Sequence, residues 1–442
     1  MSDESAVHGA SVLLSFRAEN VRSFRDEVNF SLLATALAEP GARVSVPWRE
    51  NGAKLDVLPV AGIFGANASG KSNLLRAIDD MRGLVLGSFR HSRPTGGVPR
   101  RPFMLDQTSR SEPSEFEVDL VLHGIRHRYG FVVDSDRVLE EWAFQYPKGQ
   151  ERLIFSREQD ELMLGARDRG FARVAELMLR PNALFLSTAA TTNHPALLPL
   201  YGWFERNLLL AGAESREVRQ FMTAEMLKDQ SLGLQILRFV CEADFGITGI
   251  DLEEVDSETN ERMARALEIL MEGVEPEFSD EGGFEPPTGI VLRHQGKGAA
   301  MRLGTADESF GTLVWLGLAG PVIHALSHGA VFLADELDTS LHPALVGFVV
   351  SLFNNPETNP HRAQLIFNSH DTNLLSSRTT STGGGPPRRL LGRDQIWFTE
   401  KAHGGATRLY PLSDLSPRKD EAIEERYLKG RYGAVPILSR TW

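Results

Sequence analysis

The sequence predicts an α/β fold, and two patterns lead to this prediction. Short apolar runs typical of buried strands alternate with helical segments near both ends of the chain. One such run, residues 58–64, ends in a glycine-rich turn that leads directly into a helical segment at 71–81. We therefore expect strands and helices to alternate in both end segments, with this turn between a strand and a helix.

The composition is that of an ordinary globular protein. The 442 residues are 42% hydrophobic and 24% charged, which suggests two or three domains. A single cysteine, Cys241, excludes an intramolecular disulfide and a cysteine-based zinc site. The net charge of −12 excludes a basic footprint over the whole protein. With a polar N-terminus and no apolar run long enough for a membrane span, a cytoplasmic protein is expected.

Three segments are expected from the periodicity. Residues 12–34 and 113–155 alternate as strands do and predict an antiparallel β subdomain within an N-terminal lobe, residues 1–165. A mostly helical insertion or lid, 166–287, should follow. Residues 288–442 should form a C-terminal lobe in which strands and helices alternate again, ending in a strand pair and a polar helix at 418–429.

Two stretches stand out by composition. Residues 250–285 contain 13 acidic residues and two arginines, a net charge of −11. A solvated helix and loop explains such a stretch, and a docking surface for a basic partner is the alternative. Residues 377–389 are rich in Ser, Thr, Gly and Pro and predict an irregular segment. The tail from Arg393 onward is a second candidate partner surface.

The glycine-rich turn is GANASGKS, Gly65 to Ser72, which fits the pattern G-x-x-x-x-G-K-[ST]. Its backbone N–H groups can surround phosphates, Lys71 can reach the β- and γ-phosphates, and the Ser72 hydroxyl is a Mg²⁺ ligand in this arrangement. The strand and helix on either side supply the context that the motif requires. The predicted ATP contacts are Gly65, Asn67, Ala68, Ser69, Gly70, Lys71, Ser72 and Asn73.

An apolar strand ending in Asp335-Glu336 is the expected second half of such a site. Asp335 would hold Mg²⁺ through water, and Glu336 would be the general base that polarises the attacking water. An apolar strand followed by Asp-Glu is common by itself. Its combination with the glycine-rich turn is what indicates a nucleotide hydrolase that uses ATP and Mg²⁺.

Two further elements flank Asp335. Ser309, Gly311 and Thr312 precede a predicted helix at 310–326, where the N–H groups of the first turn make an anion site. In ABC-type ATPases this signature binds the γ-phosphate held by the other protomer, although a helix cap also explains Ser309. His370 ends the next strand, 364–368, and can contact the γ-phosphate, although a lone histidine is more often structural. Lys71, Glu336 and His370 are thus the predicted catalytic residues.

Taken together, these motifs resemble the ABC-type ATPases of the SMC/RecF/OLD branch. More narrowly, the chain resembles the compact bacterial AAA ATPases of the phage-defence and abortive-infection group (RloA-like, AriA-like). The resemblance covers most of the chain. It rests on NVRSF at Asn20–Phe24, the glycine-rich turn, PFMLD at Pro102–Asp106, NALFLS at Asn182–Ser187, ESFGT at Glu308–Thr312, DELDTSLHP at Asp335–Pro343, FNSHD at Phe367–Asp371, RDQIWF at Arg393–Phe398 and YLKGRYGAVP at Tyr427–Pro436.

The resemblance assigns Lys71 and Ser72 to phosphate and Mg²⁺. It assigns Asp335 and Glu336 to the Walker B pair, Ser309 and Gly311 to the signature, and His370 to the switch histidine. The chain also departs from the pattern. His342 stands where SMC proteins have the D-loop aspartate, and Gln107 is a weak candidate for the Q-loop glutamine. Neither a long coiled coil with a zinc hook nor a Toprim-like nuclease constellation is recognisable.

The resemblance implies a homodimer or larger homo-oligomer with two ATP molecules between P-loop and signature. It also implies a sensor or regulator in anti-phage defence that acts on a separately encoded effector, such as a nuclease. A RecF-like DNA-repair or DNA-binding ATPase is one alternative, with DNA phosphates contacting Arg90, Arg93, Arg100 and Arg101. A nucleotide-gated scaffold or antitoxin-like binding protein is the other.

Overall fold

The computed structural model describes residues 11–39, 42–212, 216–243, 245–254, 288–297, 299–376, 389–418 and 421–435. Most of the acidic stretch 250–285 and nearly all of the stretch 377–389 lie outside the described residues, so the expectations for them stay predictions.

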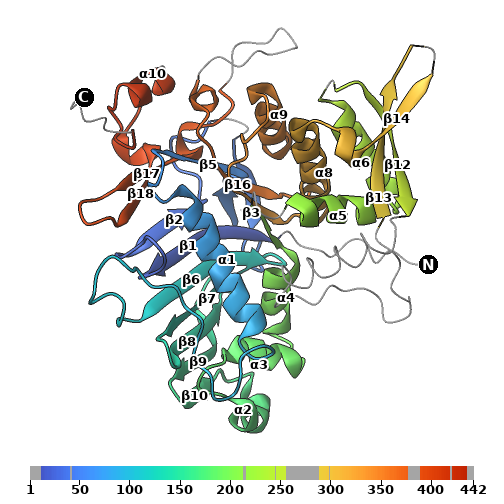
Figure 1. Ribbon diagram of the computed structural model, residues 1–442. Helices are drawn as coiled ribbons and strands as arrows, with labels where there is room; N and C mark the ends of the chain where they lie inside the picture. The colour runs from blue at the N-terminus through green and yellow to red at the C-terminus, as the bar shows by residue number, and fades with distance from the viewer. Residues whose placement is uncertain are drawn as a thin grey trace.

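A six-stranded, mostly parallel sheet forms the centre of the protein (Figure 1). Its strands, in spatial order, are β11 (Leu208–Ala211), β15 (Val331–Ala334), β16 (Gln364–Asn368), β5 (Val60–Gly65), β17 (Ile396–Lys401) and β18 (Thr407–Pro411), of which β18 alone runs antiparallel to its neighbour. The predicted α/β fold class is confirmed.

Alternating residues of β5 join two different hydrophobic cores. Ala61 and Ile63 pack with α1 (Lys71–Gly87) and the antiparallel lobe. Val60 and Phe64 pack on the other face with α8 (Phe310–His328) and α9 (Pro343–Asn354). Since successive side chains of a strand point to opposite faces, a strand covered on both faces must be apolar throughout, and all of β5 is buried.

A second, seven-stranded sheet is antiparallel, as predicted for the N-terminal lobe. Its order is β10-β9-β8-β7-β6-β1-β2. The β6–β7 turn contains His123 and Gly124 at φ 49° and 77°, values that fit a tight two-residue hairpin. The strands are β1 (Val12–Glu19), β2 (Val28–Ser31), β6 (Ser114–Leu122), β7 (Ile125–Val133), β8 (Val138–Gln145), β9 (Arg152–Glu158) and β10 (Glu161–Leu164); β3 (Val44–Pro47) and β4 (Lys54–Val57) form a separate hairpin.

One buried side chain connects the two sheets. The amide of Gln364, the first residue of β16, accepts a hydrogen bond from the Leu13 N–H at 2.7 Å and donates one to the Leu13 carbonyl at 2.9 Å. Leu13 lies at the register shift between Leu13 and Ser15 of β1. The amide therefore satisfies two backbone groups that strand pairing leaves open at this bulge.

The insertion contains helices, as expected, but also strands that we did not expect. β11 joins the central sheet, and β12 (Ile247–Glu254) pairs with β13 (Thr288–Gln295) and β14 (Ala300–Gly304). The expectation of a mostly helical insertion at 166–287 is wrong at β11 and β12, because segments this short have no decisive period. The helices are α2 (Ala172–Met178), α3 (Phe185–Thr191), α4 (Leu198–Arg206), α5 (Arg216–Met226) and α6 (Gln230–Cys241).

Two other expectations need correction. The polar helix expected at 418–429 is shorter, α10 (Ile423–Leu428), and Gly430 follows it at φ 72°. In the described part of the chain, one helix, α8, is long and apolar enough to cross a membrane, although no such run was expected. Because 67% of that window is buried, α8 has the properties of a core helix, which can be apolar all round.

Candidate functional site

The glycine-rich turn connects β5 to α1 and bends through two residues with positive φ. Ala68 has φ 61° and Gly70 has φ 102°. A Cβ atom on Gly70 would lie 2.1 Å from the Thr407 hydroxyl oxygen, so a larger residue does not fit there. No side-chain hydrogen bond caps α1 among the described residues. The first N–H groups of this helix therefore point into the turn without a side-chain partner.

Lys71 crosses the inside of the turn. Its ammonium group donates hydrogen bonds to the carbonyls of Gly65 at 2.9 Å and Ala66 at 3.1 Å. Burial lowers the pKa of Lys71, and the carboxylates of Glu336 and Asp338 oppose that shift. The charge is thus held close to the loop and within the field of the acidic residues across the site.

Hydroxyl groups from distant parts of the chain brace the turn from behind. The Ser69 and Thr399 hydroxyls are 2.6 Å apart, and the Thr407 hydroxyl lies 2.8 Å from the Ser69 carbonyl. The hydroxyls of Thr407 and Ser23 are 2.7 Å apart, and the Asn73 amide donates to Ser23 at 2.8 Å. The β17–β18 pair and the NVRSF segment therefore fix the shape of the turn.

The predicted metal ligands lie on either side of one amide. Asn368 Nδ2 lies 2.6 Å from Asp335 Oδ1 and 3.3 Å from the Ser72 hydroxyl, and Arg76 is 3.7 Å from Asp335. One carboxylate and one hydroxyl, completed by phosphate oxygens and waters, is a donor set that suits Mg²⁺. Across the described residues no group of three or more His, Cys, Asp or Glu side chains is arranged so that it could hold a metal ion by itself.

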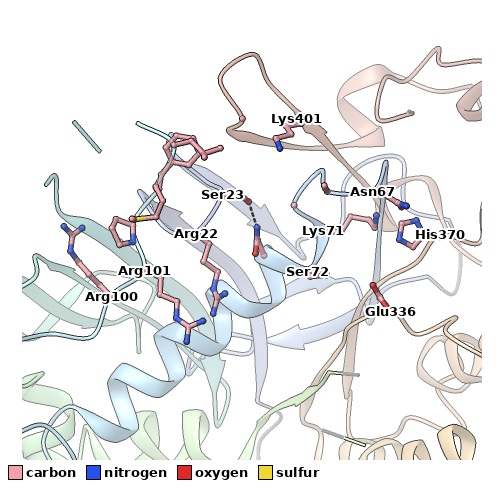
Figure 2. Close-up of a pocket in the computed structure, with 18 residues that line it drawn as sticks. Arg22, Ser23, Asn67, Lys71, Ser72, Arg100, Arg101, Glu336, His370 and Lys401 are labelled. Atoms are coloured by element: carbon pink, nitrogen blue, oxygen red, sulfur yellow. Dashed lines mark hydrogen bonds between the residues drawn. The ribbon is translucent and has the colours of Figure 1, made fainter. Parts of the chain in front are cut away.

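Glu336 and His370 lie beside the phosphate loop at one end of the site (Figure 2). Glu336 has φ 54°, its N–H bonds to the Asn368 side-chain oxygen, and its carboxylate accepts a hydrogen bond from the Thr339 hydroxyl at 3.2 Å. The His370 N–H donates to Asp338 at 3.1 Å, and its side chain is exposed. Backbone contacts therefore position both residues while their side chains stay accessible to a ligand.

A cavity of about 820 Å³ brings most of the predicted residues together. Gly65, Ser69 and Asp335 were predicted at this site but do not line the cavity: Gly65 and Ser69 are buried, and Asp335 lines a smaller neighbouring pocket beside Phe310. The predicted residues that do line it are Asn67, Ala68, Gly70, Lys71, Ser72, Asn73, Glu336 and His370.

The predicted signature residues lie elsewhere. None of Ser309, Gly311 and Thr312 lines this cavity. The Ser309 hydroxyl accepts a hydrogen bond from the Thr312 N–H at 3.1 Å and so caps α8, as the structural alternative predicts. Phe310 is 54% exposed, and the Arg216 guanidinium lies 5.1 Å from its ring centre. Within a single chain the signature turn is thus separate from the phosphate loop.

Several residues of the site were not predicted. Asn368 stands two residues before His370 within FNSHD, and its position at the end of a strand beside Asp335 is the signal that could have indicated its role. Ser23 belongs to the NVRSF motif, which was quoted without a role for this residue, and Thr407 had no signal, because only the folded chain brings it to the loop. Gln107, the candidate Q-loop residue, is exposed and does not line the cavity.

A glycine-rich turn between a buried parallel strand and a helix, with an Asp-Glu pair after a nearby strand of the same sheet, defines a P-loop NTPase. A family model described as "AAA domain, putative AbiEii toxin, Type IV TA system" matches residues 60–162 and 202–376. The chain belongs to this family.

Solved structures similar to this chain include three SMC heads. The SmcHead bound to the C-winged helix domain of ScpA has 12% identity and a TM-score of 0.42, covering 91% of this chain and 99% of that one. The SMC head domain from Thermotoga maritima has 13% identity and a TM-score of 0.39, covering 90% and 98%. An Smc head domain with an extended coiled coil, bound to the C-terminal domain of ScpA derived from Pyrococcus furiosus, has 12% identity and a TM-score of 0.39, covering 92% and 98%. The chain has no match among curated proteins.

Proposed function

We propose that this chain is a Mg²⁺-dependent ATPase whose active site is completed by a second copy of the chain, and that it acts as a sensor or regulator in anti-phage defence. The observation that carries the proposal is the division of the motifs. Lys71, Glu336 and His370 share one cavity, while Ser309 and Gly311 lie outside it.

Each group at the cavity has a role that its chemistry supports. The N–H groups of the turn and Lys71 would bind the β- and γ-phosphates. Ser72 and Asp335 would hold Mg²⁺, which neutralises phosphate charge. The Glu336 carboxylate would orient the attacking water and accept its proton, and His370 would contact the γ-phosphate. Asn368 keeps Asp335 and Ser72 in place by donating to both.

The signature turn would act on the ATP of a partner copy. Its remaining first-turn N–H groups, from Phe310 and Gly311, can bind an anion as helix N-termini do. The exposed Phe310 beside Arg216 suits a surface that is covered on assembly. Two copies arranged head to tail would place each signature over the other copy's P-loop.

The defence role rests on the family, whose description names a putative AbiEii toxin and a toxin–antitoxin system. The predicted Mg²⁺ ligand Asp335 and the predicted general base Glu336 both belong to the proposed ATPase site, and the sequence shows no recognisable Toprim-like nuclease constellation. A separately encoded effector, such as a nuclease, would therefore carry out the response to infection.

Mixing two inactive variants tests the composite site. Lys71→Ala removes the phosphate contact and Ser309→Arg blocks the signature, so each variant alone should lose almost all ATP turnover. A mixed dimer contains one site in which both halves are intact. An equimolar mixture should therefore recover roughly a quarter of the wild-type rate, measured as phosphate release. A mixture that stays as inactive as its components would show that Ser309 does not act in trans.

A further inference from the structure

The cavity extends well beyond the phosphate loop. Glu336 and His370 lie at one end, Arg100 and Arg101 lie at the opposite end, and Lys401 lies above the phosphate loop between them (Figure 2). A volume of about 820 Å³ is within the range of sites that hold a whole small molecule, so it exceeds what a triphosphate alone requires. The outer end of the cavity thus needs its own explanation.

The outer wall is a strap of residues 101–105 that is fixed to the NVRSF turn. The buried Asn20 side chain accepts a hydrogen bond from the Phe103 N–H at 2.9 Å and donates to the Ser109 carbonyl at 2.7 Å. The Arg22 N–H donates to the Arg101 carbonyl at 2.6 Å. Because these bonds involve backbone groups of the strap, its position beside the cavity is set by the fold.

The strap presents two apolar side chains to solvent at this end of the cavity. Met104 is 53% exposed and Leu105 is 67% exposed, whereas Phe103 is buried. A Cβ atom on Gly405 would lie 2.4 Å from the Leu105 Cδ1 atom, so the β17–β18 hairpin tip touches the strap. Arg101 and Lys401 are exposed cations that line the cavity, and Lys401 lies near Leu105, since its Cε atom is 3.6 Å from a Cβ atom on Gly405. Apolar surface with nearby cations is thus available where a ligand leaves the phosphate loop.

We propose that Met104 and Leu105 bind the base of the nucleotide, with Arg101 and Lys401 beside its ribose and ring edge. This inference rests on the proposed function, in which residues 65–72 hold the phosphates. A purine offers two flat apolar faces, which aliphatic and thioether side chains can cover. A guanidinium can stack on such a ring as well. The strap is therefore the part of the site that distinguishes a nucleotide from a simple polyphosphate.

The test compares ATP with inorganic tripolyphosphate, which has the same phosphate chain and no base. Leu105→Ser should weaken ATP binding on the order of tenfold, because it removes an apolar contact with the ring. Tripolyphosphate binding should not change, since the strap does not contact the phosphates. Calorimetric titration with Mg²⁺ measures both. Met163→Ser, at a 60% exposed residue of β10, is the matched control and should bind both ligands as the wild type does.

Three results would overturn the base site. ATP binding by Leu105→Ser at the wild-type strength would show that the base lies elsewhere. An equal loss for both ligands would show that the strap acts through the phosphate loop. Equal affinity of the wild type for ATP and tripolyphosphate would show that no base is bound. The proposed function fails in a different way, namely if Lys71→Ala leaves the binding of both ligands unchanged.

Discussion

The phosphate loop and the signature turn are both N-terminal turns of buried helices, yet the chain treats them differently. No side chain caps α1 among the described residues, and Ser23, Ser69, Thr399 and Thr407 brace its loop. At α8, the Ser309 hydroxyl occupies the Thr312 N–H, and the neighbouring Phe310 is exposed. Contacts within the same chain thus hold the phosphate loop in a shape that can receive a ligand. The signature turn, by contrast, has an exposed surface that no part of the same chain described here covers.

Among the substitutions predicted here, Glu336→Gln should have the largest effect on ATP turnover. It removes the general base, which lies on the phosphate-loop side of the composite site. The amide cannot accept a proton, so ATP turnover should fall by roughly a hundredfold or more while ATP binding persists. Because bound ATP is no longer consumed, the dimer should accumulate on a sizing column in the presence of ATP and Mg²⁺. Turnover at the wild-type rate would show that Glu336 is not the base.

The same variant tests the cellular role. Cells that carry the chain with its genomic neighbours should resist phage in a plating assay, and Glu336→Gln should abolish that resistance if signalling requires turnover. The conservative Glu336→Asp variant is the matched control for folding and expression. Equal plating of phage on cells with and without the wild-type chain would contradict the defence role.

Acid should weaken the antiparallel lobe, which supports the strap, through a buried histidine on β7. Burial lowers the pKa of His127 from 6.5 to about 4. Between these values the unfolded chain binds a proton that the folded chain does not, so the free energy of unfolding falls as the pH falls. The loss from pH 7 to pH 5 should be about 2 kcal/mol. Denaturant titrations of wild type and His127→Gln measure it.

The His127→Gln variant should lose that part of the pH dependence. His403→Gln, at an exposed position on the β17–β18 turn, is the control and should keep it. An identical pH dependence in all three proteins would show that burial of His127 does not couple stability to pH.

Thr407→Val should have the smallest effect on ATP turnover. It tests how much the hydrogen bonds of the Thr407 hydroxyl contribute to the shape of the phosphate loop. Valine has the shape of threonine but leaves the Ser69 carbonyl and the Ser23 hydroxyl without this partner, at a cost of roughly 1 to 2 kcal/mol. We expect roughly a tenfold lower rate of turnover with a smaller change in stability, measured by steady-state kinetics and thermal unfolding. Thr95→Val on the exposed 90–101 loop should change neither. Unchanged kinetics in Thr407→Val would show that the loop holds its shape unaided.

Short-range sequence patterns predict those structural elements of this protein that depend only on residues close together in the chain. The phosphate loop, the strand before it and the hairpin turn at His123–Gly124 all follow from short-range rules of turn geometry and apolar periodicity. The antiparallel lobe could also be predicted, because its strands are long and polar and apolar residues alternate along them.

Contacts between segments that are far apart in the sequence could not be predicted from the sequence. β11 has four residues, and its identity as a strand depends on a neighbour, β15, that lies far along the chain. In the sequence, nothing distinguishes Thr399 and Thr407 from other threonines of a C-terminal hairpin. Their contacts with Ser69 are seen only in the folded structure. Gln364 reads as a polar residue opening an apolar strand, and only the bulge in β1 explains its burial.

The order of strands also has a consequence for protein synthesis. β5 and its loop leave the ribosome early, yet both neighbours of β5 in the sheet, β16 and β17, are translated near the end of the chain. At typical elongation rates, a nascent strand that is apolar on both faces waits on the order of half a minute for its partners. During that interval it is a target for chaperones and a site of aggregation. A chain released before β17 also lacks Thr399 and Thr407, so an interrupted translation product cannot assemble the braced nucleotide site.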